Sequence, residues 1–312
     1  MSEQIILVLQ DIGVDRIEFK KMVKKANLDY EVIWEEKNIN QADDVSGIVT
    51  VKHKVDKDLL NRYSNIKFVA CSFTGFDQVD LNLCRERNIA VFNVPAYSTN
   101  SVAELTISLA ISLLRQIPEV MPVARSGDWS ALTAGIELFG KTIGIVGTGE
   151  IGLRVAELFN AFGCKLIAWS KTKRQEFVDL DGKYLDTLEE LCQQADVITV
   201  HVPLNEQTKN LINKKHFELM KPLAYLVNTA RGPIVNQVDL TQALNEKQIA
   251  GAAIDVYDQE PLPKDDLLTK ASNSLLTPHI AYKTKEALQR KAQITVDGIR
   301  AFVDGKRLNR ID

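Results

Sequence analysis

Short apolar runs rich in β-branched residues alternate with helix-like segments along the whole chain. Buried strands separated by helices are typical of parallel sheets, so the alternation predicts an α/β protein. The first series has the runs QIILVLQ, EVIW, GIVTV, IKFVAC and IAVFN. The second series has KTIGIVG, KLIAWS, DVITVHV, LAYLVN, GAAIDV and SLLTPH. Six strands are the number in a complete doubly wound nucleotide-binding domain.

Two helical segments predict where the domains meet. The polar cluster 98–101 precedes a long apolar helix expected over about 101–117, and a looser segment runs on to residue 140. A charged helix expected over about 284–303 follows the last strand and has no strand of the second series to serve. We therefore expect it to return to the first domain. The predicted domains are 1–98 completed by 284–312, and 99–283, with the ligand between them.

Composition narrows the class of protein. The 312 residues carry 38 basic and 41 acidic side chains, for a net charge of −3. This balance argues against binding to nucleic acid or to a membrane surface. The N-terminal apolar run is too short for a signal peptide, and no run is long enough to span a membrane, so we expect a cytoplasmic protein. Four irregularly spaced cysteines indicate reduced packing residues, with no metal site.

A glycine motif follows the first strand of the second series and opens a helix. We call this segment, Gly147-Thr148-Gly149-Glu150-Ile151-Gly152, the glycine turn. In this context Gly147 permits a tight turn, Gly149 lets a pyrophosphate approach the backbone, and Gly152 lets the helix pack closely on the strand. Free N–H groups at the start of the helix can hold phosphates. The motif predicts a dinucleotide cofactor rather than a plain strand–turn–helix.

The end of the next strand departs from the commonest dinucleotide-binding pattern. An acidic residue that grips the ribose is expected about twenty positions after the glycines. The chain instead has a segment that we call the basic corner, residues 170–174, which contains Ser170, Lys171, Lys173 and Arg174. Lysine and arginine form charge-assisted hydrogen bonds to phosphate, which favours NADPH. A solvated basic turn is the alternative, and NAD stays possible.

Ionisable residues follow three other strands of the second series. Arg231 comes after LVNTA, Asp255 and Glu260 lie in IDVYDQEP, and His279 follows LLTP. Parallel strands share one carboxyl edge, so these side chains can converge. Together they suit hydride transfer to a 2-keto acid. Arg231 would bind the carboxylate, His279 would exchange the carbonyl proton, and Glu260 would orient His279. Asp255 would fix the nicotinamide carboxamide. Taken singly, each residue has an ordinary surface role as its alternative.

The chain resembles the D-isomer-specific 2-hydroxyacid dehydrogenase family along almost its whole length. The resemblance is carried by TGFDQVDL (74–81), SVAEL (101–105), GKTIGIVGTGEIG (140–152), HVPL (201–204), LVNTARG (226–232), GAAIDVYDQEPLP (251–263) and TPHIA (277–281). It implies a Rossmann nucleotide-binding domain inserted into a flavodoxin-like substrate domain. It also implies a homodimer formed through the nucleotide domain, around the long helix and the loop 118–140.

The resemblance implies roles for individual residues. Arg231, Glu260 and His279 would be catalytic. The backbone of Thr74 and Gly75 would hold the substrate carboxylate together with Arg231. The implied cofactor contacts are Gly149, Glu150, Ile151, Val202, Pro203, Thr208, Thr229, Ala230 and Asp255.

Departures from the family pattern bear on cofactor and substrate. NAD-dependent members carry an acid at the position of Ser170, whereas members that resemble glyoxylate or hydroxypyruvate reductases often have a serine with basic neighbours. We therefore predict an NADPH-dependent reductase of small 2-keto acids. Lys52 could meet the distal group of the substrate, and Tyr282 and Lys283 leave its size and charge open.

Two other functions remain as alternatives. One is 3-phosphoglycerate dehydrogenase, although the arginine–serine pattern that meets its phosphate is not evident in residues 47–55. The other is a non-catalytic dinucleotide-sensing protein. The presence of Arg231, Glu260 and His279 argues against a sensor, because a sensor need not keep an acid–base pair.

Overall fold

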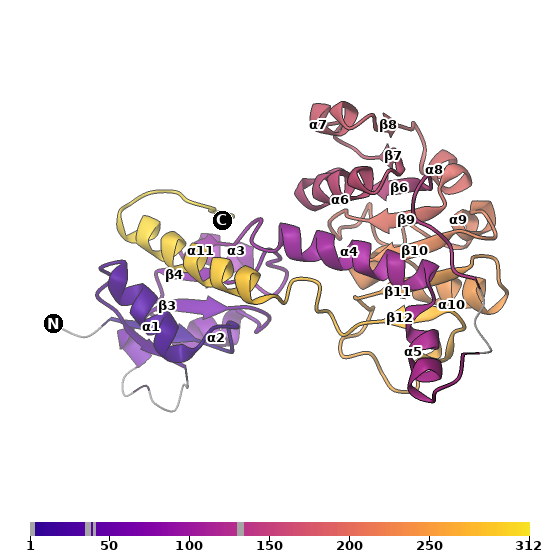
Figure 1. Cartoon of the computed structure of the whole chain (residues 1–312). Coiled ribbons are helices and arrows are strands. Elements are labelled where there is room, and N and C mark those ends of the chain that lie inside the picture. The colour runs from indigo at the N-terminus through magenta and orange to yellow at the C-terminus, as the bar shows by residue number, and fades with distance from the viewer. Residues whose placement is uncertain (1–3, 35–38, 40–41, 130–133) are drawn as a thin grey trace. The chain divides into compact units, whose positions relative to one another are not determined.

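The computed structural model describes residues 4–34, 39, 42–129 and 134–312, which form two compact units. The first unit comprises Met1–Ser98 and Lys283–Asp312, and the second comprises Thr99–Tyr282. Figure 1 colours the chain from its N-terminus in indigo to its C-terminus in yellow, and the yellow helix α11 lies among the indigo and violet elements of the first unit. Each unit has its own sheet, and each is described by itself.

The first unit is built on a five-stranded parallel sheet with the order β2-β1-β3-β4-β5. This is the order of the flavodoxin-like sheet. All residues of four of the strands are buried, which explains their unbroken apolar character. The strands are β1 (Ile5–Val8), β2 (Glu31–Ile33), β3 (Val45–Thr50), β4 (Phe68–Cys71) and β5 (Ala90–Phe92).

Helices cover both faces of this sheet. On one face α2 (Lys57–Arg62) and α3 (Leu81–Glu86) contribute to a core with the strands. On the other, α1 (Arg16–Lys25) contacts α11 (Lys285–Val303), and α11 packs on β4. The Phe302 ring of α11 lies 5.1 Å from that of Phe68. A short helix, η2 (Ala42–Asp44), precedes β3.

The long apolar helix ends earlier than the sequence pattern indicated. It is α4 (Thr99–Leu114), and a second helix, α5 (Ile117–Arg125), follows where we expected the end of one helix and a looser segment. Gln116 has a φ of 51°, in the left-handed region, which breaks the helix. Pro118 lies in the first turn of α5, where a missing N–H group costs little. Residues 130–133 of the looser segment lie outside the described residues.

The second unit has a seven-stranded parallel sheet with the order β12-β11-β10-β9-β6-β7-β8. Its first six strands in chain order have the Rossmann arrangement, and β12 adds an outer strand. The predicted fold class is therefore confirmed, but the pattern missed the two-residue β8. The strands are β6 (Thr142–Val146), β7 (Lys165–Trp169), β8 (Lys183–Tyr184), β9 (Val197–Val200), β10 (Tyr225–Asn228), β11 (Gly251–Ile254) and β12 (Ser274–Leu276).

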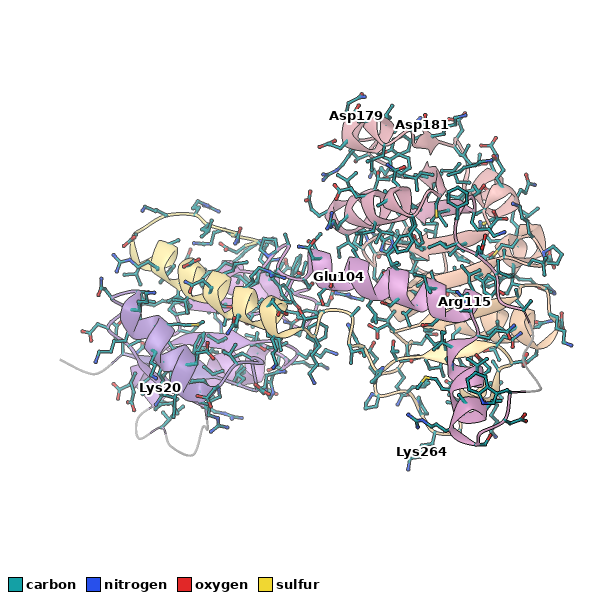
Figure 2. All side chains as sticks on the ribbon, viewed as in Figure 1. Lys20, Glu104, Arg115, Asp179, Asp181 and Lys264 are labelled. Atoms are coloured by element: carbon teal, nitrogen blue, oxygen red, sulfur yellow. The ribbon has the colours of Figure 1, made fainter. Side chains whose placement is uncertain are left out.

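Two apolar layers enclose this sheet. One face is covered by α8 (Leu188–Gln194), α9 (Lys214–Leu219) and α10 (Gln237–Asn245). The other is covered by α4, α6 (Glu150–Ala161) and α7 (Gln175–Asp179). Two short helices, η3 (Gly232–Ile234) and η4 (Leu267–Lys270), complete the unit. Figure 2 shows charged side chains at its outer surface, such as Asp179 and Asp181 at α7.

The strand order places a topological switch between β6 and β9, because the helices after these strands cover opposite faces. Ligands of open α/β sheets bind at such a switch, outside the carboxyl ends of the strands. Among the described residues, no single helix is long and apolar enough to cross a membrane. Only α4 and α5 taken together reach that length and composition, and they are bent by 65°.

Candidate active site

The glycine turn has the shape that a dinucleotide phosphate needs. Gly147 has a φ of +94°, and a side chain there would approach the His201 carbonyl oxygen to 2.9 Å. A side chain at Gly152 would collide with the Gly147 carbonyl oxygen. At Gly149, by contrast, no atom lies within 4 Å of where a Cβ would stand. The two outer glycines therefore close the turn, and the middle one leaves room beside the N-terminus of α6 for a pyrophosphate.

The segment after β9 packs against the glycine turn. The Val202 side chain lies against Gly147, and Thr208 Oγ1 donates a hydrogen bond of 2.6 Å to the Pro203 carbonyl oxygen. Thr208 therefore fastens the turn that contains the predicted contacts Val202 and Pro203. His201 begins this segment, and its Nε2 has no hydrogen-bond partner among the described residues. Burial lowers the pKa of His201 to about 3, so this imidazole is neutral and adds no charge.

The basic corner lies against the glycine turn. Ser170 Oγ accepts a hydrogen bond of 3.3 Å from the Thr148 N–H group. Arg174 forms an ion pair of 2.8 Å with Glu150, a residue of the glycine turn. Lys173 Nζ lies 3.9 Å from an Asp186 carboxylate oxygen. The structure thus brings the predicted corner and turn together, and two of the corner's cations already face carboxylates.

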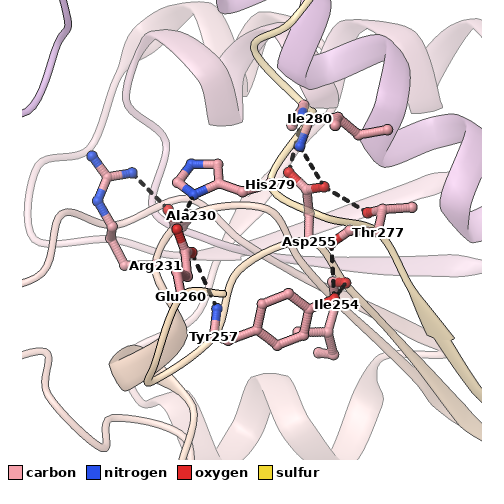
Figure 3. Close-up of polar contacts among 10 residues, drawn as sticks. Ala230, Arg231, Ile254, Asp255, Tyr257, Glu260, Thr277, His279 and Ile280 are labelled. Carbon is pink, nitrogen blue, oxygen red and sulfur yellow. Dashed lines mark hydrogen bonds and ion pairs between the residues drawn. The ribbon is translucent and has the colours of Figure 1, made fainter. Parts of the chain in front are cut away.

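The predicted acid–base pair is present as a direct contact. His279 Nδ1 and Glu260 Oε2 are 2.7 Å apart, as Figure 3 shows, and the side chains are 15% and 28% exposed. The other Glu260 oxygen accepts a hydrogen bond of 3.4 Å from the Tyr257 N–H group. His279 has a φ of 53°, a left-handed conformation that a residue other than glycine adopts only when its surroundings impose it.

Asp255 imposes that conformation. It is fully buried, and its carboxylate accepts hydrogen bonds from Thr277 Oγ1 at 2.6 Å and from the N–H groups of Ile280 and Ala281 at 2.9 Å each. Figure 3 shows the bonds that Thr277 and Ile280, which flank His279 in the sequence, make to Asp255. The sequence pattern does not reveal this supporting role. The side chain is fully buried in this structure, and its predicted contact with a carboxamide stays a prediction.

Hydrogen bonds also fix the segment that follows β10. The Asn228 side chain accepts from the Ala230 N–H group and donates to the Arg231 carbonyl oxygen, each at 3.0 Å. The Thr229 hydroxyl lies 2.9 Å from that of Thr106 on α4, in a buried contact. Arg231 NH1 donates to the Ala230 carbonyl oxygen at 2.8 Å. The predicted residues Thr229, Ala230 and Arg231 therefore share one fixed turn at the carboxyl edge of the sheet.

The predicted substrate contacts of the first unit follow β3 and β4. The Lys52 N–H group donates to Gln10 Oε1 at 3.0 Å, and Thr74 Oγ1 donates to the Val94 carbonyl oxygen at 3.0 Å. Gly75 follows Thr74 in the same half-exposed turn. These loops lie at the carboxyl edge of the first sheet, and their role in substrate binding stays a prediction.

The structure also places the Tyr282 ring beside His279, a position that the sequence pattern does not predict. Its ring meets the His279 ring edge to face, with centroids 5.6 Å apart and planes at 85°. Nothing in the chain's apolar pattern signals this contact. Tyr282 forms an aromatic wall beside the imidazole of the acid–base pair.

The four cysteines lie in the packed interior. All four thiols are free and buried, and burial raises the pKa of Cys71 and Cys192 to about 12. Within residues 4–34, 39, 42–129 and 134–312, no three histidine, cysteine, aspartate or glutamate side chains are grouped so as to hold a metal ion.

Comparison with known proteins identifies the family. The sequence model of the "D-isomer specific 2-hydroxyacid dehydrogenase, NAD binding domain" matches residues 107–281, more than half of the chain. The chain belongs to the D-isomer-specific 2-hydroxyacid dehydrogenase family. Its resemblance to this family is thereby confirmed, and with it the assignment as an oxidoreductase that uses a nicotinamide dinucleotide.

Three proteins of known activity are similar to this chain. A glyoxylate reductase of Thermofilum pendens is 37% identical over 86% of this chain and 81% of its own length. A D-lactate dehydrogenase of Aquifex aeolicus, solved with NAD and lactic acid, is 29% identical with a TM-score of 0.83, over 97% of this chain and 96% of its own. An acyclic imino acid reductase (Bsp5), solved with NADPH and D-Arg, is 27% identical with a TM-score of 0.87, over 99% and 100%.

We expect Asp255→Asn to reduce kcat by about ten- to a hundredfold. The amide nitrogen would replace one carboxylate oxygen, so its hydrogens would face either the Ile280 or the Ala281 N–H group, which bond to different oxygens. The loss of a bond to a charged acceptor costs about 1.5–3 kcal/mol. Thr277→Val is the matched control, because it removes one of the three bonds and keeps the carboxylate, so its effect should be smaller. Steady-state rates and thermal unfolding of both variants test this. A folded Asp255→Asn protein with unchanged kcat contradicts the supporting role.

Proposed function

We propose that the protein reduces small 2-keto acids to the corresponding 2-hydroxy acids with NADPH, with glyoxylate or hydroxypyruvate as substrate. The observation that carries this proposal is the Glu260–His279 contact of 2.7 Å, held by the buried Asp255 at the carboxyl edge of a sheet that also bears the glycine turn. The relative named glyoxylate reductase supports the substrate class.

The chain's own residues account for binding and proton transfer. When bound, the nicotinamide supplies the hydride. With Nδ1–H donating to Glu260, His279 can present a proton at Nε2 to the carbonyl oxygen of the substrate and take it back in the reverse direction. The Glu260 carboxylate stabilises the imidazolium and fixes the ring. Arg231 binds the substrate carboxylate and polarises the carbonyl group, and we assign Lys52, Thr74 and Gly75 to the substrate's carboxylate and distal group.

We propose that the basic corner binds the 2′-phosphate of NADPH. Ser170 cannot repel a phosphate as an aspartate would, and Lys171, Lys173 and Arg174 supply positive charge. The imino acid reductase that binds NADPH shares the fold, whereas the D-lactate dehydrogenase binds NAD. The ion pair between Arg174 and Glu150 favours the NAD alternative, because a bound phosphate has to compete with this carboxylate.

We also propose a homodimer that forms through the second unit. Exposed apolar side chains occur on α5 and in the chain segments that follow it, including Met121, Trp129 and Phe139, of which Trp129 is 80% and Phe139 is 74% exposed. Phe139 lines a hollow together with Ile111, Leu114 and Arg115 of the α4 end, and Figure 2 labels Arg115 there. Exposed apolar surface of this kind is typical of an interface.

The four free thiols suit a reducing compartment, and we propose the cytoplasm.

We expect the wild-type protein to reduce glyoxylate or hydroxypyruvate in a panel of about a dozen 2-keto acids. His279→Ala should lose about 10²–10⁴-fold in turnover and retain cofactor affinity, because only the proton donor is removed. The panel includes 3-phosphohydroxypyruvate, and preferential use of it would establish the phosphoglycerate dehydrogenase alternative. Cofactor binding without turnover of any acid would establish the sensor alternative.

Ser170→Asp should lower kcat/KM with NADPH by about ten- to a hundredfold and leave NADH equal or better, since it adds repulsion to a lost contact. Ser170→Ala is the matched control, because it removes the hydroxyl without adding charge and should have a smaller effect. The wild-type preference should weaken as salt rises, since the corner is exposed. Equal use of both cofactors by the wild type, or an unchanged ratio in Ser170→Asp, contradicts the NADPH assignment.

Phe139→Asp should convert the dimer to a monomer at micromolar concentration, because it places a charge in the apolar surface. Leu223→Asp is the control, since Leu223 is 73% exposed and does not line the hollow. Sedimentation velocity reports the mass of each protein. A monomeric wild type, or a Phe139→Asp protein that stays dimeric, would overturn this assembly.

A further inference from the structure

Tyr184 joins the two segments that form the proposed cofactor site. It lies on β8, the short strand that the sequence pattern missed. Its hydroxyl oxygen is 2.8 Å from Thr148 Oγ1 and accepts a hydrogen bond of 2.9 Å from the Arg174 N–H group. Thr148 belongs to the glycine turn, and Arg174 ends the basic corner. The Tyr184 hydroxyl therefore bonds to both the glycine turn and the basic corner.

The directions of these hydrogen bonds form a consistent chain. Thr148 Oγ1 donates to the Thr172 carbonyl oxygen at 3.3 Å, so its own proton is used there. The Tyr184 hydroxyl must then donate to Thr148 Oγ1 while it accepts from Arg174. Each hydroxyl both gives and receives one bond. The backbone of the basic corner is thus tied to the glycine turn at Thr172 and Arg174, in addition to the contact between Ser170 and Thr148.

The Tyr184 ring is fixed independently of its hydroxyl. It packs on Phe177 of α7, with ring centroids 4.9 Å apart and planes at 54°. Lys173 Nζ lies 5.8 Å from the Tyr184 ring centroid, within reach of a cation–π contact. The ring therefore contacts Lys173, while the hydroxyl bonds to the Arg174 N–H group and to Thr148 Oγ1, which in turn bonds to Thr172. Removal of the hydroxyl alone would leave both ring contacts in place.

We propose that Tyr184 is a positioning residue that sets the preference for NADPH over NADH. This proposal rests on the proposed binding of a 2′-phosphate by the basic corner. Lysine and arginine side chains lose much conformational freedom when they bind a phosphate, and a backbone fixed beforehand reduces the ordering that binding requires. A cofactor without the 2′-phosphate makes no use of the corner, so its affinity depends little on Tyr184.

Tyr184→Phe tests the proposal, because it keeps the ring and removes only the hydroxyl. We expect the dissociation constant for NADPH to rise about tenfold, as for one lost hydrogen bond in a site that binds charge, and that for NADH to change less than about twofold. The kcat at saturating NADPH should be unchanged, since Tyr184 is remote from the Glu260–His279 pair along the sheet order. Adenosine 2′,5′-bisphosphate should lose affinity as NADPH does, and adenosine 5′-monophosphate should not.

The control is Tyr225→Phe, which removes a tyrosine hydroxyl from the same unit. Tyr225 is the first residue of β10 and so lies at the amino edge of the sheet, away from the glycine turn. It should leave both dissociation constants unchanged. Thr148→Val and Thr148→Ser form a second pair. The valine variant loses the bonding group and should reproduce the selective loss, whereas the serine variant keeps the hydroxyl and should bind NADPH nearly as well as the wild type.

The outcomes separate this proposal from the one on which it rests. A wild-type protein that binds NADPH no more tightly than NADH overturns the proposed 2′-phosphate site. A wild type that prefers NADPH, with an unchanged preference in Tyr184→Phe, overturns the role of Tyr184 alone. An equal loss of both cofactors in Tyr184→Phe also overturns it, since Tyr184 would then only support the glycine turn. If Tyr184→Phe does not fold, the Thr148 pair decides by the same criteria.

Discussion

The hydrogen bonds that the buried Asp255 carboxylate accepts from residues 277–281 hold the catalytic edge of the second unit together. Parallel β11 and β12 end side by side, and this carboxylate ties the segment after one strand to the end of the other. The grip on Ile280 and Ala281 keeps His279 in its left-handed conformation. Glu260 lies in the loop that follows Asp255. Both members of the acid–base pair are therefore positioned by segments that contain or contact this one buried carboxylate. Without these hydrogen-bond donors, the free-energy cost of burying a carboxylate away from water would be too high.

The proposed cofactor site at this sheet edge is also held by contacts between segments that follow different strands, but these contacts are weaker and more exposed. The glycine turn after β6 rests on the segment after β9, and the basic corner after β7 is bonded to the glycine turn. Its cations are exposed, and exposed ion pairs such as Arg174–Glu150 contribute little to stability. The acid–base pair, by contrast, has side chains that are only 15% and 28% exposed, and its contact is 2.7 Å long. Cofactor choice and proton transfer therefore occupy opposite ends of one sheet edge, and residues that tune one need not disturb the other.

The success of the sequence patterns follows from the burial they report. Strands such as β3 and β4 are covered on both faces, so their apolar runs are unbroken and easily found. Glu260 and His279 could be paired because parallel strands end at one edge. The two-residue β8 carries no periodicity, and the break at Gln116 depends on one backbone conformation, so neither leaves a pattern. The supporting bonds of Asp255 and Tyr184 join residues distant in the chain, which composition and spacing do not encode.

The return of α11 to the first unit makes that unit depend on a segment that is synthesised after the whole second unit. Residues of β4 and β5, Phe68 and Phe92, face α11, and a side chain at Gly298 would press on Phe92. Until α11 is available, one face of the first sheet lacks part of its apolar cover, whereas the second unit already has its complete sequence. Domains usually fold in the order of synthesis. This topology reverses that order for the two units, so the first unit can be completed only after the second unit has been synthesised.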